Sequence, residues 1–450
     1  MNTVAQRNNL VLYPSAICNL NCTYCYIDKN PALRDIDEIL ESSFAGDYYF
    51  NFAKEMFPDP NQLRSVEFWG GEPSLGLDRT IPTIIRYLDY YTNLDSFFMS
   101  TNLTSPTGLK NTCQFFEMLG ESSLKYKKKF SFNLQLSLDG PKEINDLQRG
   151  AGVTKKFTTK FAELCKAVNK LCSEYPDLNI TLQFKPTLTS KIIHDNLLTS
   201  DGVIKYYQFF ETYNDTFIEL CPAQNANLVL VKPNTASPSP HTVQDGKEFA
   251  EFCKICNDVM VESMNGANYF KYFTDLVPFR TRYNIDYSKI SYCQSCGACG
   301  SGLSMVGLLP YDYVSCCHSG FVNLISDYKL HCIEKKDTAL DFRLFMDKSN
   351  YLIKHKNEYS QYEKNVSFAY NDNSKVKLGN IAAIISLLAK NGQIDKKYID
   401  TREALKGALF MQASTAYCFR DTTGVTGSAA LYPVGIVRLL LNGAREVIES

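Results

Sequence analysis

Short apolar runs alternate with helical patterns through the first half of the chain, and this alternation predicts parallel β/α units. Strands are expected at residues 9–13, 65–69, 96–100, 130–138, 179–184 and 217–221. Helical patterns lie between them, at about residues 36–56, 78–91, 106–120, 156–173 and 192–211. Polar, glycine-containing segments follow several of the strands. We therefore predict an α/β fold, a partial (β/α)6 TIM-type barrel with its functional site at the carboxyl ends of the strands.

The chain has 450 residues, which is too long for one ordinary hydrophobic core, so several domains are expected. We assign residues 1–232 to the partial barrel, and residues 233–290 to a proline-containing linker followed by bridging helices. Residues 291–450 are cysteine-rich at their start and then largely helical. This pattern predicts a metal-binding C-terminal domain with a helical tail.

Composition excludes some classes of partner and indicates a role for the clustered cysteines. The net charge of −1 provides no basic field, so nucleic acid is not expected as a partner. No apolar run reaches membrane-spanning length and residues 2–9 do not resemble a signal peptide, so we expect a cytoplasmic protein without a membrane partner. Because the cytosol keeps thiols reduced, the clustered members of the 16 cysteines are predicted to bind metal.

Cys18, Cys22 and Cys25 follow the first predicted strand with the spacing C-x3-C-x2-C, and Tyr24 precedes the last of them. Three thiolates on one loop can bind three irons of a 4Fe–4S cube and leave the fourth iron without a protein ligand. A structural zinc site is the alternative, but zinc normally takes a fourth cysteine or histidine, and this loop has none. The spacing resembles that of the radical S-adenosylmethionine (SAM) superfamily, in which the open iron binds the amine and carboxylate of SAM.

Further motifs at predicted strand ends resemble the same superfamily. The Gly70-Gly71-Glu72-Pro73 segment is similar to its GGE motif, whose backbone and carboxylate hold the ammonium of SAM. The segment 137–141, followed by Arg149, is similar to its SLDG stretch. Taken alone, the first segment is also typical of an ordinary strand-to-helix turn, and Asn102 of a strand-end cap. The resemblance implies that seven residues contact SAM: Tyr24, Gly70, Gly71, Glu72, Asn102, Ser137 and Arg149.

A second group of cysteines lies farther along the chain: Cys293, Cys296, Cys299, Cys316 and Cys317. With the Leu-Gly-Asn-Ile segment at residues 378–381, this group resembles the SPASM/twitch extension of radical SAM enzymes, which carries auxiliary iron–sulfur clusters. The final cysteine run of the full pattern is missing here, so the resemblance implies a single auxiliary 4Fe–4S cluster, held by Cys293, Cys299 and Cys317. Its fourth ligand is left open between a substrate atom and three cysteines: Cys296, Cys332 and Cys418. A zinc ribbon is the alternative.

SPASM-type enzymes mostly modify ribosomally made peptides or proteins, so the resemblance implies a peptide maturase. Such an enzyme abstracts a hydrogen from its substrate and makes a crosslink, a thioether, an epimerised residue or an oxidised side chain. The expected partners are a peptide or protein substrate, an electron donor such as flavodoxin or ferredoxin, and a separate leader-binding protein. Three alternatives stay open: a sulfatase-maturase-like dehydrogenase, a small-molecule twitch-type radical SAM enzyme, and a zinc-stabilised binding module. The sequence identifies no catalytic acid or base.

Overall fold

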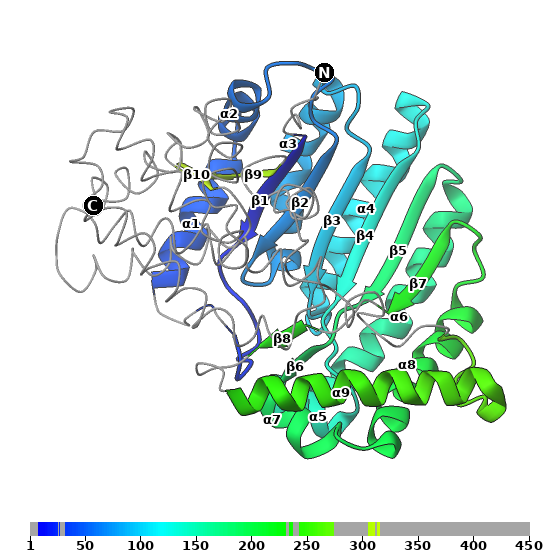
Figure 1. The fold of residues 1–450 in the computed structure, drawn as a ribbon. Helices are drawn as coiled ribbons and strands as arrows, with labels where there is room; N and C mark the ends of the chain where they lie inside the picture. Colours follow the sequence, from blue (N-terminus) through cyan, green and yellow to red (C-terminus); the bar gives the residue numbers. More distant parts are fainter. Residues whose placement is uncertain are drawn as a thin grey trace, which may run out of the picture. The chain divides into compact units, whose positions relative to one another are not determined.

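The computed structural model describes residues 8–25, 27, 32–230, 234–236, 243–273, 305–310 and 313–315. These residues form a parallel β-sheet with helices, drawn in Figure 1, and the expected α/β class is confirmed. The predicted C-terminal domain, residues 291–450, lies almost entirely outside the described residues. Within the described ranges, every helix is too short or too polar to span a membrane.

Six parallel strands stand in the sheet in the order in which they occur along the chain. They are β1 (Asn9–Ser15), β2 (Ser65–Gly70), β3 (Ser96–Thr101), β4 (Phe130–Leu136), β5 (Leu178–Phe184) and β7 (Ala226–Leu230). A doubly wound sheet reverses its strand order at one point, whereas this order does not reverse. All six carboxyl ends therefore lie at one edge of the sheet, as they do in a barrel.

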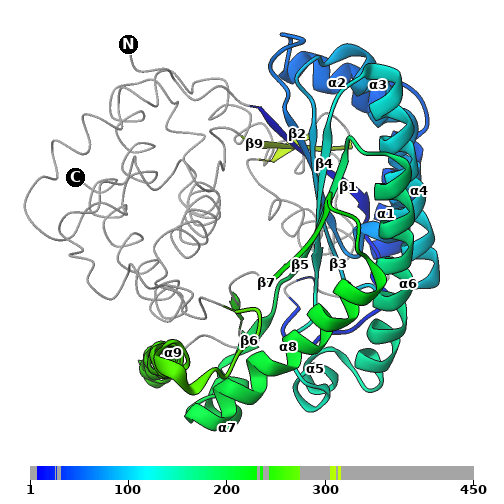
Figure 2. The same ribbon diagram turned by 90° about the vertical axis from the view of Figure 1, so that its right-hand side faces the viewer.

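The larger connecting helices cover one face of this sheet, as Figure 2 shows. The helical elements that link the strands are α1 (Ala32–Phe44), α2 (Tyr48–Met56), η1 (Pro73–Gly76), α3 (Leu77–Tyr90), α4 (Pro106–Tyr126), α5 (Lys142–Arg149), α6 (Val153–Glu174), α7 (Ser190–Asn196) and α8 (Ser200–Leu220). The other elements are β6 (Thr187–Thr189), β8 (Asn234–Ala236), α9 (Val243–Glu262), η2 (Ser263–Ala267), β9 (Met305–Leu309) and β10 (Tyr313–Ser315). Sequential strands with helices on a single face form an open TIM-type barrel, so the predicted partial barrel is confirmed.

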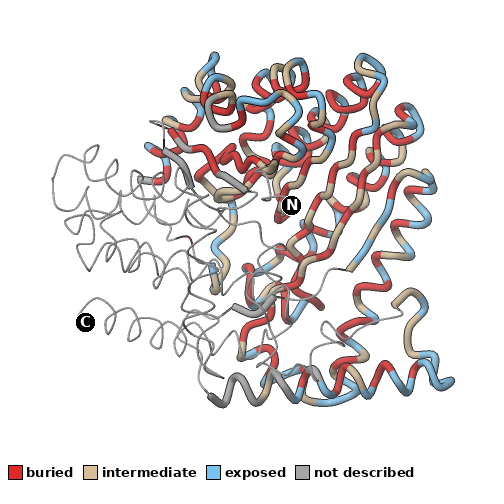
Figure 3. The backbone as a smooth tube through the Cα atoms, turned by 45° about the horizontal axis from the view of Figure 1, so that its top comes forward, coloured by how far each residue is buried: buried red, intermediate tan, exposed pale blue. Residues whose placement is uncertain are grey.

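The hydrophobic core lies between the sheet and the helices. Every second residue of β4 and β5 is buried, starting from Phe130 and Leu178, and the residues between them are only half-buried. Figure 3 shows this alternation along the strands. Phe115 of α4 packs against Phe97 of β3 and Phe132 of β4, with ring centroids 5.8 and 5.7 Å apart. Burial of these aromatic rings holds the helices to the sheet, because apolar area removed from water stabilises the fold.

The sixth strand does not occupy its predicted position. The sequence predicts a strand at residues 217–221, but α8 continues through residue 220, and the sixth strand is β7 at residues 226–230. The prediction is wrong because a short apolar run fits a helix as well as a strand. Here the run continues a helical spacing in which the buried residues recur every three or four positions: Val203, Tyr206, Phe210, Tyr213 and Phe217.

Two predicted helices are each divided in the structure. The helix expected at 36–56 is α1 and α2, and Gly46 lies between them with a φ of +110° that glycine adopts without steric cost. The helix expected at 192–211 is α7 and α8. Thr199 caps α8, because its side chain accepts a hydrogen bond from the backbone N–H of Gly202 at 3.1 Å. The segment 233–290, expected to be a linker followed by bridging helices, contains β8 and α9.

Replacing Phe97 with alanine should destabilise the barrel strongly. The Phe97 side chain is fully buried against α4, so its removal leaves a cavity that costs about 3–5 kcal/mol of unfolding free energy. The neighbouring Phe98 points to the opposite face and is half-buried, so Phe98→Ala is the matched control and should cost less than about 2 kcal/mol. Urea unfolding measures both variants. Equal losses would contradict this assignment of the two faces.

Candidate active site

The carboxyl edge of the sheet brings the predicted site residues together. The cysteine loop, defined here as residues 16–25, follows β1. Gly71 and Glu72 follow β2, Asn102 follows β3, and Ser137 follows β4. These segments are far apart in the sequence, but neighbouring parallel strands place their carboxyl ends side by side.

The two glycines after β2 allow the cysteine loop to lie directly against this strand. The backbone N–H of Gly71 donates to the carbonyl of Ser15 at 3.0 Å, and that of Glu72 donates to the carbonyl of Ile17 at 2.8 Å. A Cβ on Gly71 would lie 2.4 Å from the carbonyl oxygens of both Ala16 and Ile17, and one on Gly70 would lie 2.3 Å from that of Ser15. No other residue type fits at these positions without moving the loop.

Glu72 is a buried carboxylate with neutral hydrogen-bond donors. It is 3% exposed, and its Oε1 accepts from the hydroxyls of Ser74 and Thr101, each at 2.6 Å. Its Oε2 accepts from the backbone N–H of Asn102 at 2.8 Å. Burial raises the pKa of the Glu72 carboxyl, and these hydrogen bonds oppose the shift. Among the described residues no cation pairs with this carboxylate, and Oε2 has acceptor capacity to spare, so the site fits an ammonium group.

Asn102 links the end of β3 to the cysteine loop. Its Nδ2 donates to Oδ1 of Asn19 at 2.9 Å and lies 3.7 Å from Sγ of Cys18. Its Oδ1 accepts from the hydroxyl of Thr104 at 2.6 Å. The side chain predicted to contact SAM is thus placed beside the first cysteine of the motif, where an amide N–H can donate to a thiolate.

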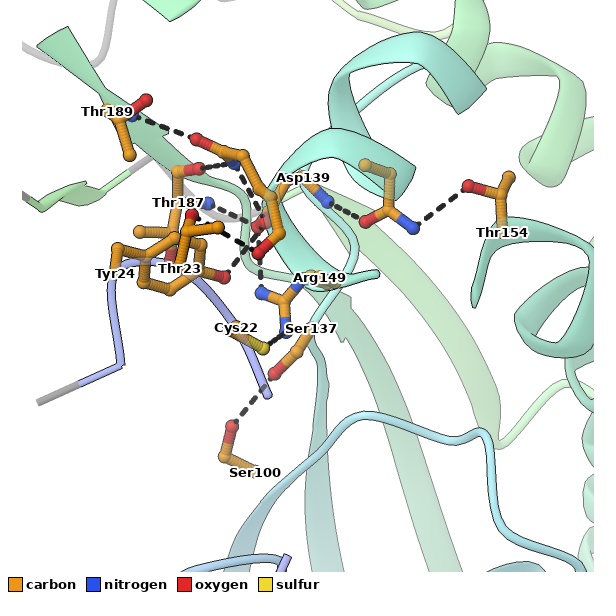
Figure 4. A network of polar contacts seen from close by, with 12 residues as sticks. Cys22, Thr23, Tyr24, Ser100, Ser137, Asp139, Arg149, Thr154, Thr187 and Thr189 are labelled. Carbon is orange, nitrogen blue, oxygen red and sulfur yellow. Dashed lines mark hydrogen bonds and ion pairs between the residues drawn. The ribbon is translucent and has the colours of Figure 1, made fainter. Parts of the chain in front are cut away.

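Arg149 of α5 lies beside the second cysteine, as Figure 4 shows. Its Nη2 pairs with Oδ1 of Asp139 at 2.8 Å, and its Nη1 lies 4.0 Å from Sγ of Cys22. Burial disfavours the charged guanidinium, but the interactions with Asp139, Tyr24 and Cys22 together outweigh that effect and raise the pKa of Arg149. The Nε atom is buried without a hydrogen-bond partner in the described part of the chain, so the guanidinium keeps one donor for a further acceptor.

The remaining predicted residues lie around this group. Tyr24 places its ring 5.5 Å from the Arg149 guanidinium carbon and donates its hydroxyl to Oδ2 of Asp139 at 2.8 Å. The Ser137 hydroxyl lies 3.4 Å from that of Ser100, and the backbone N–H of Ser137 donates to Thr101. Ser137 therefore continues the rim between β3 and β4.

The three thiols of the cysteine loop occupy the same edge at different depths. Cys18 and Cys22 are half-buried, and Cys25 is exposed. In the described part of the chain, no three cysteine, histidine or acidic side chains converge closely enough to hold a single metal ion. A cube needs its thiolates on three separate irons, so it takes ligands that stand farther apart. With an amide near Cys18, a guanidinium near Cys22 and a glycine cradle, the residues present fit a 4Fe–4S cluster.

Three other cysteines of the barrel have a different environment. Cys165, Cys172 and Cys221 are buried in the core. Burial raises the pKa of Cys165 and of Cys172 to about 12, and that of Cys221 to about 11. These groups stay protonated at neutral pH and are not suited to binding metal.

The predicted auxiliary ligands Cys293, Cys296, Cys299 and Cys317 lie outside the described residues, as do Cys316, Cys332 and Cys418. Strand β10 ends directly before Cys316.

Sequence reasoning missed one residue of the described site, Asp139. Its position in the segment 137–141, directly after the end of a strand, was the available signal, but the resemblance of this region assigned roles only to Ser137 and to Arg149 beyond it.

No family model matches the chain. A cysteine-type anaerobic sulfatase-maturating enzyme of Clostridium novyi is 28% identical over 218 residues, which are 47% of this chain and 50% of that protein. The radical SAM cyclopropyl synthase TigE of Paramaledivibacter caminithermalis is 24% identical over 177 residues, 38% of this chain and 35% of that protein. The resemblance to radical SAM maturases is confirmed.

The matches cover only parts of the proteins concerned. The chain spans about half the length of the curated relatives it matches. Among solved structures, Streptococcus suis SuiB bound to the precursor peptide SuiA aligns with a TM-score of 0.39 and 15% identity, over 71% of this chain and 61% of that one.

Glu72→Gln should change how stability depends on pH. Because the carboxyl pKa is raised in the fold, the native state binds more protons than the unfolded chain between the ordinary glutamate pKa and the raised value. The unfolding free energy of the wild type should therefore fall, relative to the Gln variant, as pH rises through this window. Urea unfolding at several pH values from about 4 to about 7 measures the difference. Parallel profiles for the two proteins would show that the fold does not raise the pKa of Glu72.

Proposed function

We propose that this chain is a radical SAM maturase that modifies a ribosomally made peptide. The observation that carries the proposal is the cysteine loop, which is bonded to the glycine cradle of β2 at the carboxyl edge of a partial barrel. Two of the similar proteins support the maturase class by their names, a sulfatase-maturating enzyme and a cyclopropyl synthase. Both names describe chemistry on another molecule rather than a structural role.

In this proposal, Cys18, Cys22 and Cys25 hold a 4Fe–4S cluster. When bound there and reduced, the cluster supplies one electron to SAM, which gives methionine and a 5′-deoxyadenosyl radical. Glu72 attracts the ammonium of SAM with a carboxylate that lacks a cation among its described partners. Arg149 offers its free Nε donor toward an anionic group. Asn102 and Ser137 line the rim between these two charges, and Tyr24 covers the guanidinium.

The face of the sheet opposite the helices offers a surface for a peptide. Its described side chains are half-buried and include amides on neighbouring strands, where Nε2 of Gln183 donates to Oδ1 of Asn133 at 3.3 Å. Trp69 stacks on Phe98 on the same face, with ring centroids 5.4 Å apart. Amide groups pair with peptide backbone, and aromatic rings pack against side chains, so this lining supports a peptide over a small polar substrate.

We propose three further components. Cleavage of SAM consumes one electron, so we propose a protein electron donor such as flavodoxin or ferredoxin. We also propose that Cys293, Cys299 and Cys317 hold one auxiliary 4Fe–4S cluster, with Cys296 as a candidate fourth ligand. Held by these cysteines, the cluster would supply an electron acceptor for the substrate radical or an iron that binds a substrate group. A separate leader-binding protein is proposed to deliver the peptide.

Sulfatase maturation is the second candidate, because cysteine-type sulfatase-maturating enzymes recur among the similar proteins. The two candidates differ in their substrate. A mass change on a cysteine-containing sulfatase peptide, incubated with reduced enzyme and SAM, would favour this second candidate. Modification of a short precursor peptide encoded beside this gene, with the sulfatase peptide unchanged, would favour the first.

Replacing Cys18, Cys22 and Cys25 together with alanine should remove about four irons per chain and abolish formation of 5′-deoxyadenosine. The physical reason is that no thiolates remain on the loop to hold the cluster. Cys113→Ala is the matched control, because Cys113 lies on α4, away from the loop in the sequence, and is half-buried. Iron analysis and chromatography of the reaction measure both effects. Wild-type levels of 5′-deoxyadenosine from the triple variant would overturn the proposed function.

The iron content of the reconstituted wild type counts the clusters. One SAM cluster and one auxiliary cluster together give about eight irons per chain. A content near four irons with one zinc would instead support a zinc ribbon at the second cysteine group. A content near twelve would indicate a second auxiliary cluster, with further candidate ligands at Cys253, Cys256, Cys332 and Cys418.

A further inference from the structure

The Asp139 side chain accepts four hydrogen bonds, and the proposed chemistry does not use it. It is completely buried directly after Ser137 and Leu138. Its Oδ1 accepts from Nη2 of Arg149 at 2.8 Å and from the backbone N–H of Thr187 at 2.9 Å. Its Oδ2 accepts from the hydroxyl of Tyr24 at 2.8 Å and from Nε2 of Gln148 at 2.9 Å. Four donors thus occupy both carboxylate oxygens.

Three of the four donor residues also lead to the cysteine loop (Figure 4). Tyr24 belongs to the loop itself. Arg149 places its Nη1 near the sulfur of Cys22. The backbone carbonyl oxygen of Gln148 accepts a hydrogen bond from the backbone N–H of Thr23 at 2.8 Å. The second half of the cysteine loop is therefore bonded to α5 through residues that Asp139 holds in place.

The backbone of Asp139 is fixed independently of its side chain. Its N–H donates to Oδ1 of Asn145 at 3.0 Å, and its carbonyl accepts from the hydroxyl of Tyr206 at 2.9 Å. Asn145 lies on α5 and Tyr206 on α8, so the carboxylate starts from a rigid position. A buried carboxylate with a cationic partner and four donors holds its neighbours more firmly than a neutral group would.

We propose that Asp139 is the positioning residue that holds Tyr24 and Arg149, and with them the cysteine loop around Cys22, in the geometry that receives the cluster. The inference rests on the proposed function, because it takes this loop as the cluster site. Arg149 then has a partner within the protein, Asp139, so its guanidinium stays beside Cys22 of the loop whether or not it also contacts SAM. Asp139 touches no reacting atom in this account.

The test compares Asp139→Asn with Asp146→Asn in the full-length protein, kept reduced and free of iron. An amide at 139 places an NH2 group against two donors, so it cannot accept all four hydrogen bonds. Asp146 is the matched control. It lies on α5 and accepts from the backbone N–H of Thr154 at 2.8 Å and from that of Gly152 at 3.1 Å, neither of which belongs to the cysteine loop.

Amide hydrogen exchange measures directly how often the backbone of the cysteine loop opens. Residues 18–25 should exchange at least about tenfold faster in Asp139→Asn, since a lost hydrogen bond to a charged group shifts local opening by that factor, and should stay unchanged in Asp146→Asn. In protein reconstituted with iron, the electron paramagnetic resonance signal of the reduced cluster in the presence of SAM should change in the first variant and match the wild type in the second. Unchanged exchange in Asp139→Asn, or equal loosening in both variants, would overturn the inference.

A second variant and a separate iron measurement distinguish failure of this proposal from misfolding and from failure of the proposed function. If Asp139→Asn does not fold, Tyr24→Phe is used instead, because it removes only the hydroxyl that donates to Asp139. Faster exchange of residues 18–25 in this variant then supports the proposal, and unchanged exchange overturns it. Iron binding by the wild type is scored separately. Failure of the wild type to bind iron would overturn the proposed function, whereas the exchange result without iron still shows whether Asp139 holds the loop.

Discussion

The contact between the cysteine loop and the end of β2 is the constraint on which the rest of the site depends. Backbone hydrogen bonds from Gly71 and Glu72 fix the carbonyls of Ser15 and Ile17, and only glycine at position 71 leaves room for this approach. Because β2 is paired with β1 and β3 along its length, the start of the loop is fixed relative to the sheet. The thiols are therefore presented from a rigid edge.

Two buried carboxylates organise the opposite ends of this loop. Glu72 ties η1 and the end of β3 to β2 through neutral donors, beside the first cysteine. Asp139 ties the second half of the loop to α5 and β6 through donors that include the Arg149 guanidinium. Burying a charge is costly unless it is well bonded, so two such groups at one edge indicate a site rather than a simple core. Among the described residues Glu72 has only neutral donors, whereas Asp139 is paired with a guanidinium.

The alternation of apolar runs was sufficient to predict the barrel, because strand and helix periods differ clearly in long segments. It failed at residues 217–221, where a short apolar run fits both periods and the helical spacing from Val203 decides the outcome. Glu72 could be predicted because its motif is contiguous. The role of Asp139 could not, because its donors are spread from residue 24 to residue 187 and meet only in the fold. The auxiliary cysteines rest on resemblance alone.

The central claim is that the cysteine loop holds a cluster to which SAM binds directly. Electron–nuclear double resonance tests it most directly, on the reduced, reconstituted protein with SAM that carries a nitrogen-15 label on its amine. Nuclei bonded to or adjacent to an iron of the cluster give a hyperfine coupling that distant nuclei do not. The account predicts such a coupling to the labelled amine. A well-formed cluster whose spectrum shows no coupling to bound, labelled SAM would contradict it.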